Sequence, residues 1–275
     1  MKVFRLIGMA LLALCMNFAS CSNDDDENNA GGTVVSGKLL LRMTTTDSGN
    51  RPFQFNYNEK RQLTSIPVTP WDEKLDIEWL NSKVLAKTVR TSDNSSLEEA
   101  YFTIDKEKGV VTHTDVMWVG DYRGLQTTTL TYDKDNHLIK TSGAHKCTWS
   151  WENGNVVKFT LYSNDGVTID HTCTFTYHTD KENKHPVMDI EWVGFYYTST
   201  TEMADKLFVV HPYLLGTPNK NLLKSVTRTD YCHNPKREWT TSFTYEFDSD
   251  GYPIKVIRNS DDSKYGNETY TLMWD

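Results

Sequence analysis

The sequence pattern that decides the fold is Tyr245-Glu246-Phe247-Asp248-Ser249-Asp250-Gly251-Tyr252-Pro253-Ile254. Its first part alternates aromatic and polar residues, which is the period of a strand with one buried and one solvated face. The Asp-Gly dipeptide in the middle supplies the positive φ of a tight hairpin turn, and an apolar strand follows it. The stretch therefore predicts a β-hairpin whose aromatic side chains share one face.

The same strand–turn–strand unit recurs along the chain. Phe53, Phe55 and Tyr57 alternate with polar residues, and an apolar strand follows from Leu63 to Val68. Repeated hairpins at a spacing of roughly 20–28 residues predict an antiparallel meander. Because exposed edges attract other strands, such a sheet must close or be covered. We expect an all-β fold of about 12–16 strands, an antiparallel meander of repeated hairpins curled into a barrel or half-barrel. Further copies of the unit lie at residues 75–89, 101–114, 130–138, 149–156 and from 175.

One segment, residues 195–222, departs from this rhythm. The aromatic residues at 195–197 have the composition of a strand, whereas residues 205–215 and the following Pro218 predict a short helix or a long loop. The hairpin pattern resumes at Leu223 and continues to Trp274. The segment is therefore expected to interrupt the meander.

Composition and charge narrow the classes of protein to which the chain can belong. Its 8 Trp, 14 Tyr and 11 Phe residues favour strands. A formal net charge of −8 argues against a nucleic-acid partner, which requires clustered Lys and Arg. No apolar run reaches the length of about 18 residues that a transmembrane helix needs. After Cys21 the remaining cysteines are Cys147, Cys173 and Cys232, an odd number whose spacing requires no disulfide.

The beginning of the chain resembles a bacterial lipoprotein signal. Lys2 and Arg5 form a positive n-region, and residues 6–14 form an apolar core that is too short to span a bilayer. Small residues precede Cys21 and an acidic run follows it. The resemblance implies that Cys21 is acylated, with an ordinary cleaved secretory signal as the alternative. We predict a lipoprotein signal peptide over 1–20, an acidic flexible linker over 21–36 and a single β-barrel-like domain over 37–275.

The hairpin units and the signal together resemble a known family. The aromatic-x-Tyr-Asp-x-Asp-Gly/Asn unit is similar to the YD-type β-hairpin repeat. With the signal, residues 37–275 resemble a family of anaerobe outer-membrane lipoproteins classed as a domain of unknown function with a porin-like fold. The resemblance implies a lipid-anchored protein of the outer membrane, compatible with exposure at the cell surface. It supplies no catalytic residues, and members of the family have been suggested to bind lipid.

Two of the turns invite a calcium interpretation. They are Asp133-x-Asp135-Asn136 and Asp248-x-Asp250-Gly251. A calcium loop of the EF-hand type carries a Glu at its twelfth position, and neither turn has one. Hairpin chemistry explains both turns without a metal, so we predict no metal site there.

Two His-x-Cys pairs occupy matching places in two hairpin units. They are His145-x-Cys147 and His171-x-Cys173. The return strand expected at 156–162 would separate them by about 9–10 Å. That separation is too large for one zinc ion or for a disulfide, so we interpret both pairs as packing residues.

Enzyme motifs are not found in the sequence. It has no Gly-x-Ser-x-Gly elbow, His-Glu-x-x-His helix, phosphate-binding Gly loop or Cys-x-x-Cys pair. The adjacent acids Glu98-Glu99 and Asp261-Asp262 are typical of solvated positions, whereas a catalytic pair converges from separate strands. We predict a protein that is not an enzyme and has no cofactor.

Aromatic rows on neighbouring hairpins are the remaining signal, and three interpretations stay open. The rings fill the interior, line a cavity for an apolar ligand such as a fatty acid or sterol, or face lipid in a transmembrane barrel. Lys140, Lys158 and Lys255 within predicted strands weaken the third interpretation. The candidate ligand-binding residues are Trp149, Trp151, Phe175, Tyr177, Phe243 and Tyr245.

These observations lead to a functional prediction. We expect a non-enzymatic, lipid-anchored envelope protein that binds a hydrophobic or amphipathic, lipid-like ligand through aromatic side chains. A surface lipoprotein that binds glycan or protein is the alternative, and a hydrolase such as a glycosidase, whose two acids need no local motif, is the third possibility. The expected partners are the membrane, through the anchor, and a small hydrophobic ligand. The sequence specifies neither the ligand nor any protein partner.

Overall fold

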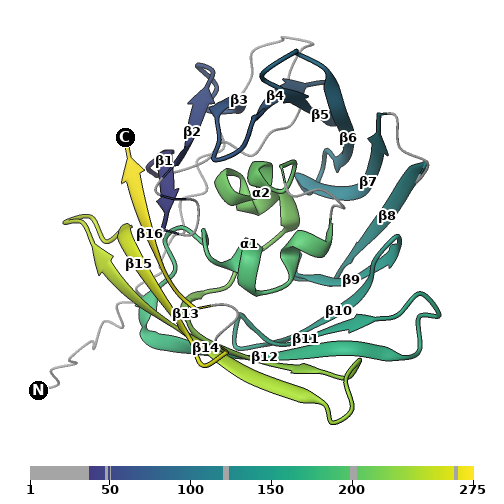
Figure 1. The fold of residues 1–275 in the computed structure, drawn as a ribbon, viewed down its shortest axis with the longest axis vertical. Coiled ribbons are helices and arrows are strands. Elements are labelled where there is room, and N and C mark those ends of the chain that lie inside the picture. Colours follow the sequence, from purple (N-terminus) through teal and green to yellow (C-terminus); the bar gives the residue numbers. More distant parts are fainter. Residues whose placement is uncertain (1–36, 47–48, 50, 120–123, 199–202, 263–265) are drawn as a thin grey trace, which may run out of the picture.

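The described part of the chain folds into a closed barrel of sixteen antiparallel strands in the computed structural model (Figure 1). The structure describes residues 37–46, 49, 51–119, 124–198, 203–262 and 266–275. Each strand pairs with its neighbours in sequence, and β1 closes the barrel against β16. The strands are β1 (Leu40–Thr45), β2 (Pro52–Tyr57), β3 (Leu63–Val68), β4 (Glu73–Trp79), β5 (Lys83–Arg90), β6 (Ser96–Asp105), β7 (Val110–Trp118), β8 (Leu125–Tyr132), β9 (Leu138–Gly143), β10 (Lys146–Glu152), β11 (Asn155–Tyr162), β12 (Ile169–Glu182), β13 (Asn221–Asp230), β14 (Arg237–Phe247), β15 (Pro253–Ser260) and β16 (Asn267–Trp274).

The predicted all-β meander is confirmed, and the sheet closes completely rather than stopping at a half-barrel. The predicted signal peptide, the lipidation site Cys21 and the linker lie within residues 1–36, outside the described residues, and stay predictions. No helix in the described part of the chain is long and apolar enough to cross a membrane.

The barrel wall turns its aromatic face inward. On β2, Phe53 and Phe55 are buried and Gln54 between them is exposed. The same alternation on the other strands places their buried apolar residues in one core cluster inside the barrel. Period-two patterning thus predicts which side chains share a face, and barrel closure makes that face the interior.

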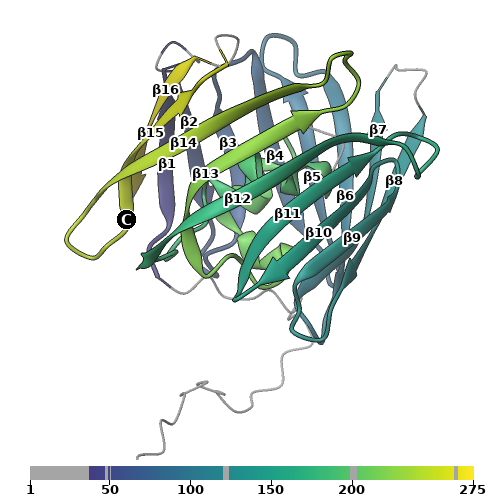
Figure 2. The ribbon, with the colours of Figure 1, turned by 90° about the horizontal axis from the view of Figure 1, so that it is seen from below.

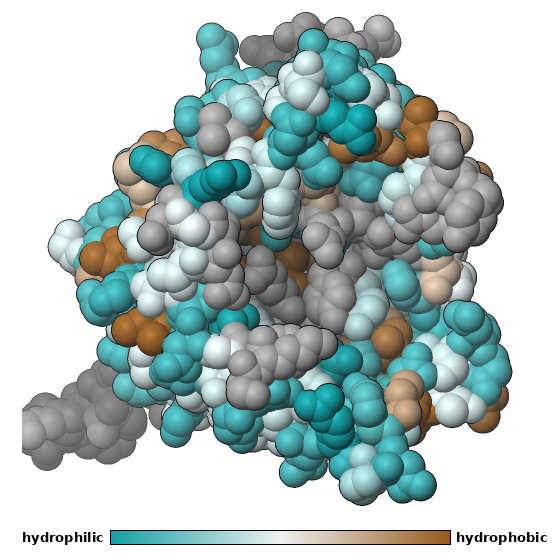
Figure 3. All heavy atoms as spheres, viewed as in Figure 1, coloured by the Kyte–Doolittle hydropathy of each residue, from teal (hydrophilic) through white to brown (hydrophobic). Residues whose placement is uncertain are grey.

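Outside, the wall is polar and carries ion pairs across neighbouring strands. Lys87 on β5 is directly opposite Glu99 on β6, with 3.2 Å between Nζ and Oε1. Lys255 on β15 is directly opposite Glu246 on β14 at 2.7 Å. Figure 3 looks onto one end of the barrel, where the described surface is largely hydrophilic with apolar residues in separate spots.

The segment between β12 and β13, described at residues 183–198 and 203–220, lies in the interior of the barrel (Figures 1 and 2). It contains α1 (Asp189–Trp192), the 3-10 helix η1 (Phe195–Thr198), α2 (Lys206–Val210) and the 3-10 helix η2 (Pro212–Leu215). We name the described part of this segment the plug. The end of the barrel where it joins the wall is the plug end, and the opposite end is the open end. The predicted helix or loop at 205–215 is confirmed as α2 and η2.

The strand-like interpretation of residues 195–197 is wrong, because these residues form η1 of the plug. Gly194 precedes them with φ +82°, and a Cβ there would lie 2.8 Å from the Phe159 ring. The glycine lets the plug backbone approach the wall closely. The Phe195 ring packs on Trp149 at 5.9 Å between centroids, and Tyr197 stacks on Phe159 at 5.5 Å. These aromatic residues therefore gain burial from the wall rather than from strand pairing.

The plug also supplies hydrogen-bond partners to the wall. The backbone N–H of Leu63 donates to His211 Nε2 at 2.9 Å, and that of Val156 donates to Asn219 Oδ1 at 2.7 Å. Buried backbone donors are costly when they are left unpaired. The plug therefore satisfies polar groups of the barrel in addition to covering its apolar face.

A recurring hydrogen bond ties the strands together at the plug end. Among the described strands, seven of the eight pairs formed by an odd strand and the next even strand share it. A Tyr or Trp at the plug end of the even strand donates to a backbone carbonyl at the start of the odd strand. The exception is β6, whose last inward residue is the apolar Ile104. We name these contacts rim bonds, and their distances are 2.6–2.8 Å: Tyr57 to Leu40, Trp79 to Leu63, Tyr132 to Val111, Trp151 to Leu138, Tyr177 to Val156, Tyr245 to Leu223 and Trp274 to Pro253.

The rim bonds explain why aromatic residues with a donor stand beside the turns. Burial raises the pKa of Tyr132, Tyr177 and Tyr245, so their hydroxyls stay protonated and donate. A buried Tyr or Trp requires a partner for its polar atom, and the carbonyl provides it. The unit Tyr132-Asp133 therefore has two functions, because the ring ties the rim and the carboxylate builds the turn.

On the wall strands, most of the buried polar side chains lie toward the open end. The buried polar residues on the open-end halves of the strands include threonines, carboxylates and cations. The residues concerned are Thr45, Thr88, Glu98, Thr128, Thr141, His171, Thr241, Arg258 and Glu268.

The rim bonds generate a test of stability. We expect Tyr245→Phe to lower the free energy of unfolding by about 1–2 kcal/mol, because the buried carbonyl of Leu223 loses its donor. Tyr101→Phe is the matched control, since the Tyr101 hydroxyl lies on the outer wall, 3.2 Å from Glu99 Oε2. We expect the control to change stability by less than about 0.5 kcal/mol. Urea unfolding followed by fluorescence measures both, and equal losses in the two variants would contradict the structural role of the rim bonds.

Candidate functional site

A pocket lies between the plug and the wall at the open end, beside the seam where β1 and β16 close the barrel. Its volume is about 310 Å³. The wall contributes residues from β1, β2, β15, β16 and the β3–β4 loop, and the plug contributes two residues. We name it the seam pocket. It is lined by Met43, Thr45, Phe53, Pro70, Trp71, Trp192, Lys206, Arg258, Glu268 and Tyr270.

Two oppositely charged side chains form part of the pocket wall. Arg258 and Glu268 are directly opposite each other on β15 and β16, and Arg258 Nη1 lies 3.1 Å from Glu268 Oε2. Each side chain is only 6% exposed. The Tyr270 hydroxyl donates to Glu268 Oε2 at 2.6 Å. A buried ion pair is weak evidence for stability, because its desolvation cost rivals its attraction. Folding stability alone therefore does not account for the presence of these two charges.

Lys206 brings a second cation to the pocket from the first turn of α2. The residue is 8% exposed, and its Nζ lies 5.3 Å from the centroid of the Phe53 ring. Arg258 makes a similar contact, with Cζ 5.1 Å from the centroid of the Trp192 ring. Cations over aromatic faces gain about 0.5–2 kcal/mol, depending on their desolvation. The aromatic residues of the seam pocket thus support its cations.

The aromatic walls of the pocket differ in exposure. Trp71 is 48% exposed and packs edge-to-face on the buried Phe53, with 5.6 Å between centroids. Trp192 packs edge-to-face on Phe243 at 5.5 Å. Its Nε1 is buried and has no hydrogen-bond partner among the described residues. Such a donor calls for an explanation, since nearly all buried polar groups are paired.

The six aromatic residues predicted as ligand contacts lie on the inner faces of β10, β12 and β14, outside the lining of the seam pocket. Trp149 is buried and donates to the carbonyl of Val193 in the plug at 2.9 Å. Phe175 and Phe243 lie in the core, and Phe243 contacts the pocket residue Trp192. The other three residues form rim bonds: Trp151, Tyr177 and Tyr245. The role of all six residues in ligand contact stays a prediction.

Sequence reasoning missed the charged residues of the seam pocket. The pocket joins strands near both ends of the chain to an inserted segment, so no local motif contains it. One signal was available for the wall residues. Arg258 follows the buried Val256, and Glu268 precedes the buried Tyr270, each at a spacing of two. Charges at inward positions of predicted strands are unusual and mark candidate sites.

Comparisons with known proteins fit this architecture. The family model described as "Domain of unknown function (DUF4595) with porin-like fold" matches residues 69–255. The chain belongs to this family. A porin-like protein from Bacteroides uniformis aligns with a TM-score of 0.57 at 15% identity, over 86% of this chain and 96% of that one. A porin-like protein from Bacteroides vulgatus aligns with a TM-score of 0.55 at 10% identity, over 86% and 99%. No curated protein matches the chain.

Membership of the DUF4595 family supports the fold and leaves the chemistry open. At these levels of identity the two Bacteroides structures show a shared fold alone. Porins with a similar number of strands enclose an aqueous channel. In this DUF4595 barrel the plug occupies the interior, and its side chains pack into the aromatic core. The ligand chemistry must therefore be argued from the chain's own residues.

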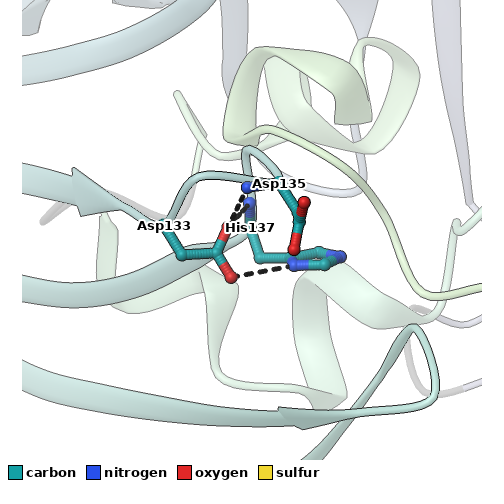
Figure 4. Close-up of side chains that lie close together, drawn as sticks. All are labelled: Asp133, Asp135 and His137. Atoms are coloured by element: carbon teal, nitrogen blue, oxygen red, sulfur yellow. Dashed lines mark hydrogen bonds and ion pairs between the residues drawn. The ribbon is translucent and has the colours of Figure 1, made fainter.

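Among the described residues of this DUF4595 chain, one group of three could share a metal ion: Asp133, Asp135 and His137. One potential ligand atom from each of the three lies within 4.8 Å of the other two. Asp133 Oδ1 accepts the backbone N–H groups of Asp135 and His137, and its Oδ2 lies 3.0 Å from His137 Nδ1 (Figure 4). The His137 ring stacks on Trp151 at 4.3 Å between centroids. Asn136 has a φ of 64°, the conformation that the tight turn requires. Hairpin structure accounts for each of these contacts.

Cys147 lies on β10 and His145 comes directly before that strand, whereas His171 and Cys173 lie on β12, with β11 between the two pairs, as predicted. His145 and His171 both contact the plug residue Tyr197, at 5.3 and 5.8 Å between ring centroids. Burial raises the pKa of Cys147 and of Cys173 to about 12, which keeps both thiols protonated. These contacts are those of packing residues.

All three described cysteines are free. Cys147 and Cys173 are buried on different strands, and Cys232 is exposed in the β13–β14 loop. The structure therefore places no disulfide in the described part of the barrel.

Burial shifts the pKa values of several groups at the interface of plug and wall. It lowers the pKa of His211 to about 3 and that of His185 to about 4. Burial, with a smaller contribution from Arg228, lowers the pKa of His171 to about 4. Asp189 shifts the other way, because burial raises its pKa to about 7 despite hydrogen bonds from side-chain amides.

These shifts predict acid sensitivity. Between about pH 6.5 and 4.5 the three histidines bind protons when unfolded and not when folded, so they lower stability as the pH falls. Asp189 has the opposite effect on stability. Over the same pH window its carboxyl is protonated in the folded chain and ionised in the unfolded chain. For these four groups, three protons against one leave a net uptake of about two on unfolding, a contribution of about 2.7 kcal/mol per pH unit, and the lowered pKa of His145 acts in the same direction. Urea unfolding at several pH values measures this slope.

His211→Gln isolates one contribution to that slope. We expect the slope to decrease by about 1.4 kcal/mol per pH unit, while the Gln carbonyl accepts the N–H of Leu63 in place of the imidazole. At pH 8 histidines are neutral in both states, so the difference there reports packing alone. An unchanged slope in the variant would contradict the lowered pKa of His211.

Proposed function

We propose that this chain is a non-enzymatic, lipid-anchored envelope protein that binds a hydrophobic or amphipathic, lipid-like ligand in the seam pocket. The observation that carries the proposal is the buried pair of Arg258 and Glu268 in the wall of a cavity of about 310 Å³. The remaining lining is largely apolar and aromatic. Concave sites of about 300–1,000 Å³ with apolar walls and a few placed polar groups are typical of small-molecule binding.

The proposal moves ligand contact from the predicted aromatic rows to the seam pocket. The plug covers those rows, and the Trp149 indole is already bonded to it. Phe243, one of the predicted aromatic residues, does not line the pocket but packs on the lining residue Trp192. The buried Trp192 Nε1 without a partner among the described residues is a donor that a polar ligand atom would satisfy.

The position of the N-terminal segment supports access to the pocket. Lys38, directly before β1, forms an ion pair with Asp248 at 2.8 Å, and Asp248 lies in the β14–β15 turn at the plug end. A tether from an acylated Cys21 would therefore reach the barrel at the plug end. The seam pocket lies at the open end, so its mouth would face away from the membrane that holds the anchor.

Ligand titration tests this function. The probe is decanoate, and the protein is the chain carrying Cys21→Ala, purified without detergent, so that its own acyl group does not interfere. We expect saturable binding in calorimetry that Trp71→Ala weakens about tenfold, because Trp71 is an exposed aromatic wall of the pocket. Tyr231→Ala is the matched control, since Tyr231 is 43% exposed in the β13–β14 loop and does not line the pocket.

Two outcomes would overturn the proposal. One is decanoate binding that Trp71→Ala leaves unchanged, which would place the ligand elsewhere. The other is binding of a neutral oligosaccharide in place of decanoate. That result would favour the glycan-binding alternative, with Trp71 as a stacking platform for sugar rings.

A further inference from the structure

A second cavity lies on the outer wall of the barrel, on strands that do not contribute to the seam pocket. Its volume is about 450 Å³, and its lining comes from β9, β10, the end of β11 and the loop between β11 and β12. These three strands are neighbours in the wall (Figure 2). We name this cavity the wall groove. Its volume is within the range of about 300–1,000 Å³ that is typical of small-molecule sites.

Strand register places the main lining residues on the outer face of the wall. Lys140 on β9 is directly opposite Thr148 on β10. Lys146 on β10 is directly opposite Tyr162 on β11. Cys147, between Lys146 and Thr148, points the other way and belongs to the buried core cluster. Because side chains alternate between the two faces of a strand, the first four residues share the outer face.

The groove exists because β9 and β10 pair over a short length. Their register contains two residue pairs, whereas β9 pairs with β8 at five positions. At one of the two pairs the Cys147 backbone N–H donates to the Thr141 hydroxyl, at 3.1 Å. The end of the β9–β10 hairpin is therefore wide, and it leaves a hollow in the wall.

Lys140 differs in its surroundings from other lysines of the outer wall. Lys87 and Lys255 are each directly opposite a glutamate on the next strand and form an ion pair with it. The residues directly opposite Lys140 are threonines on both sides, Thr131 and Thr148. Within the described part of the chain Lys140 forms no ion pair. Its ammonium group is therefore a cation beside a cavity without a fixed counter-charge.

The carboxylate of the groove, Asp165, is held by its own loop. It accepts the backbone N–H groups of Val167 and Thr168 at 2.8 and 2.9 Å. Hydrogen bonds from Thr168 and Val167, with a smaller contribution from the charge of Lys146, lower the pKa of Asp165 to about 2. The Lys146 ammonium in turn donates to the carbonyl of Asn164. Lys146 and Asp165 thus offset each other in the loop, and Lys140 remains.

Hydroxyl groups and one aromatic ring complete the lining. The side chains of Ser142, Thr148 and Tyr162 form no hydrogen bond within the described residues, and the Tyr162 ring contacts no other ring there. A hydroxyl both donates and accepts hydrogen bonds. A ligand rich in hydroxyls therefore matches this lining better than an alkyl chain does.

We infer that the wall groove binds an acidic sugar, a saccharide unit whose ring carries hydroxyls and one carboxylate. Lys140 pairs with the carboxylate through a charge-assisted hydrogen bond. Ser142 and Thr148 exchange hydrogen bonds with the sugar hydroxyls, and the C–H face of the sugar ring packs on Tyr162. The inference does not depend on the ligand proposed for the seam pocket, because the two cavities share no residue.

Three small probes test this inference on the full chain carrying Cys21→Ala. Methyl glucuronide has the sugar ring and the carboxylate, methyl glucoside has the ring alone, and acetate has the carboxylate alone. We expect methyl glucuronide to bind about tenfold more tightly than either of the others. Amide NMR shifts measure the three affinities and locate the site, with the largest changes expected at Ser142, Thr148 and Tyr162. The glucuronide affinity should fall with added NaCl, since salt screens charge.

Variants of Lys140 connect the affinity to the groove. Lys140→Met should lower the affinity for methyl glucuronide about tenfold, to that for methyl glucoside, and leave methyl glucoside binding unchanged. Lys140→Arg should keep most of the affinity. Lys158→Met is the matched control, because Lys158 is also exposed on the outer wall without an ion pair among the described residues, but does not line the groove.

Three outcomes would overturn the inference. Equal affinities for methyl glucuronide and methyl glucoside would remove the role of Lys140. Acetate binding as tightly as methyl glucuronide would reduce the groove to a site for simple anions. Amide shifts confined to residues outside the groove would place the sugar elsewhere. Decanoate binding should be the same in Lys140→Met as in the parent chain, so the test is separate from that of the seam pocket.

Discussion

The apolar and aromatic inner face of a sixteen-stranded barrel has to be shielded from water, and the rest of the structure depends on this requirement for burial. Eight strands enclose a space that wall side chains can fill, whereas sixteen enclose a space wide enough for a channel. Here most inward residues are apolar, so water in that space would expose much of the core cluster. The plug resolves the problem by placing helices inside the sheet. Barrel closure, aromatic alternation and plug are therefore one solution to one burial problem.

The plug enters at a position that the local hairpin chemistry explains. It replaces the turn between β12 and β13, beside the rim bond of Tyr177. The same rim bond occurs next to short turns, as at Tyr132 and Tyr245, so the rim is closed whether a turn or a long insertion follows. Because the strands are tied by their own aromatic donors, the connection is free to vary in length. Loop insertion at such a site has a small thermodynamic cost.

The part of the fold that follows local rules was predictable from the sequence. Period-two alternation and Asp-Gly turns indicated the hairpins, and β3 has the predicted bounds of Leu63–Val68. The plug was harder, because composition alone does not separate a buried 3-10 helix from a strand. The sequence at 195–197 has strand-like chemistry, and the wall residues on which Phe195 and Tyr197 pack, Trp149 and Phe159, are far away in sequence. The seam pocket was out of reach for the same reason, since Arg258 and Lys206 come together only through tertiary structure.

The family match and the candidate site carry different kinds of information. The matched region, residues 69–255, contains the plug with Trp192 and Lys206, and it ends before Arg258 and Glu268. Membership thus supports the porin-like fold, whereas the matched region does not include the ion pair of the seam pocket. Folds accept different sites without changing their architecture. Here the wall could have closed with apolar residues on β15 and β16, since an apolar replacement of a buried ion pair is often neutral or stabilising. The charges at positions 258 and 268 are therefore more readily explained by recognition than by folding.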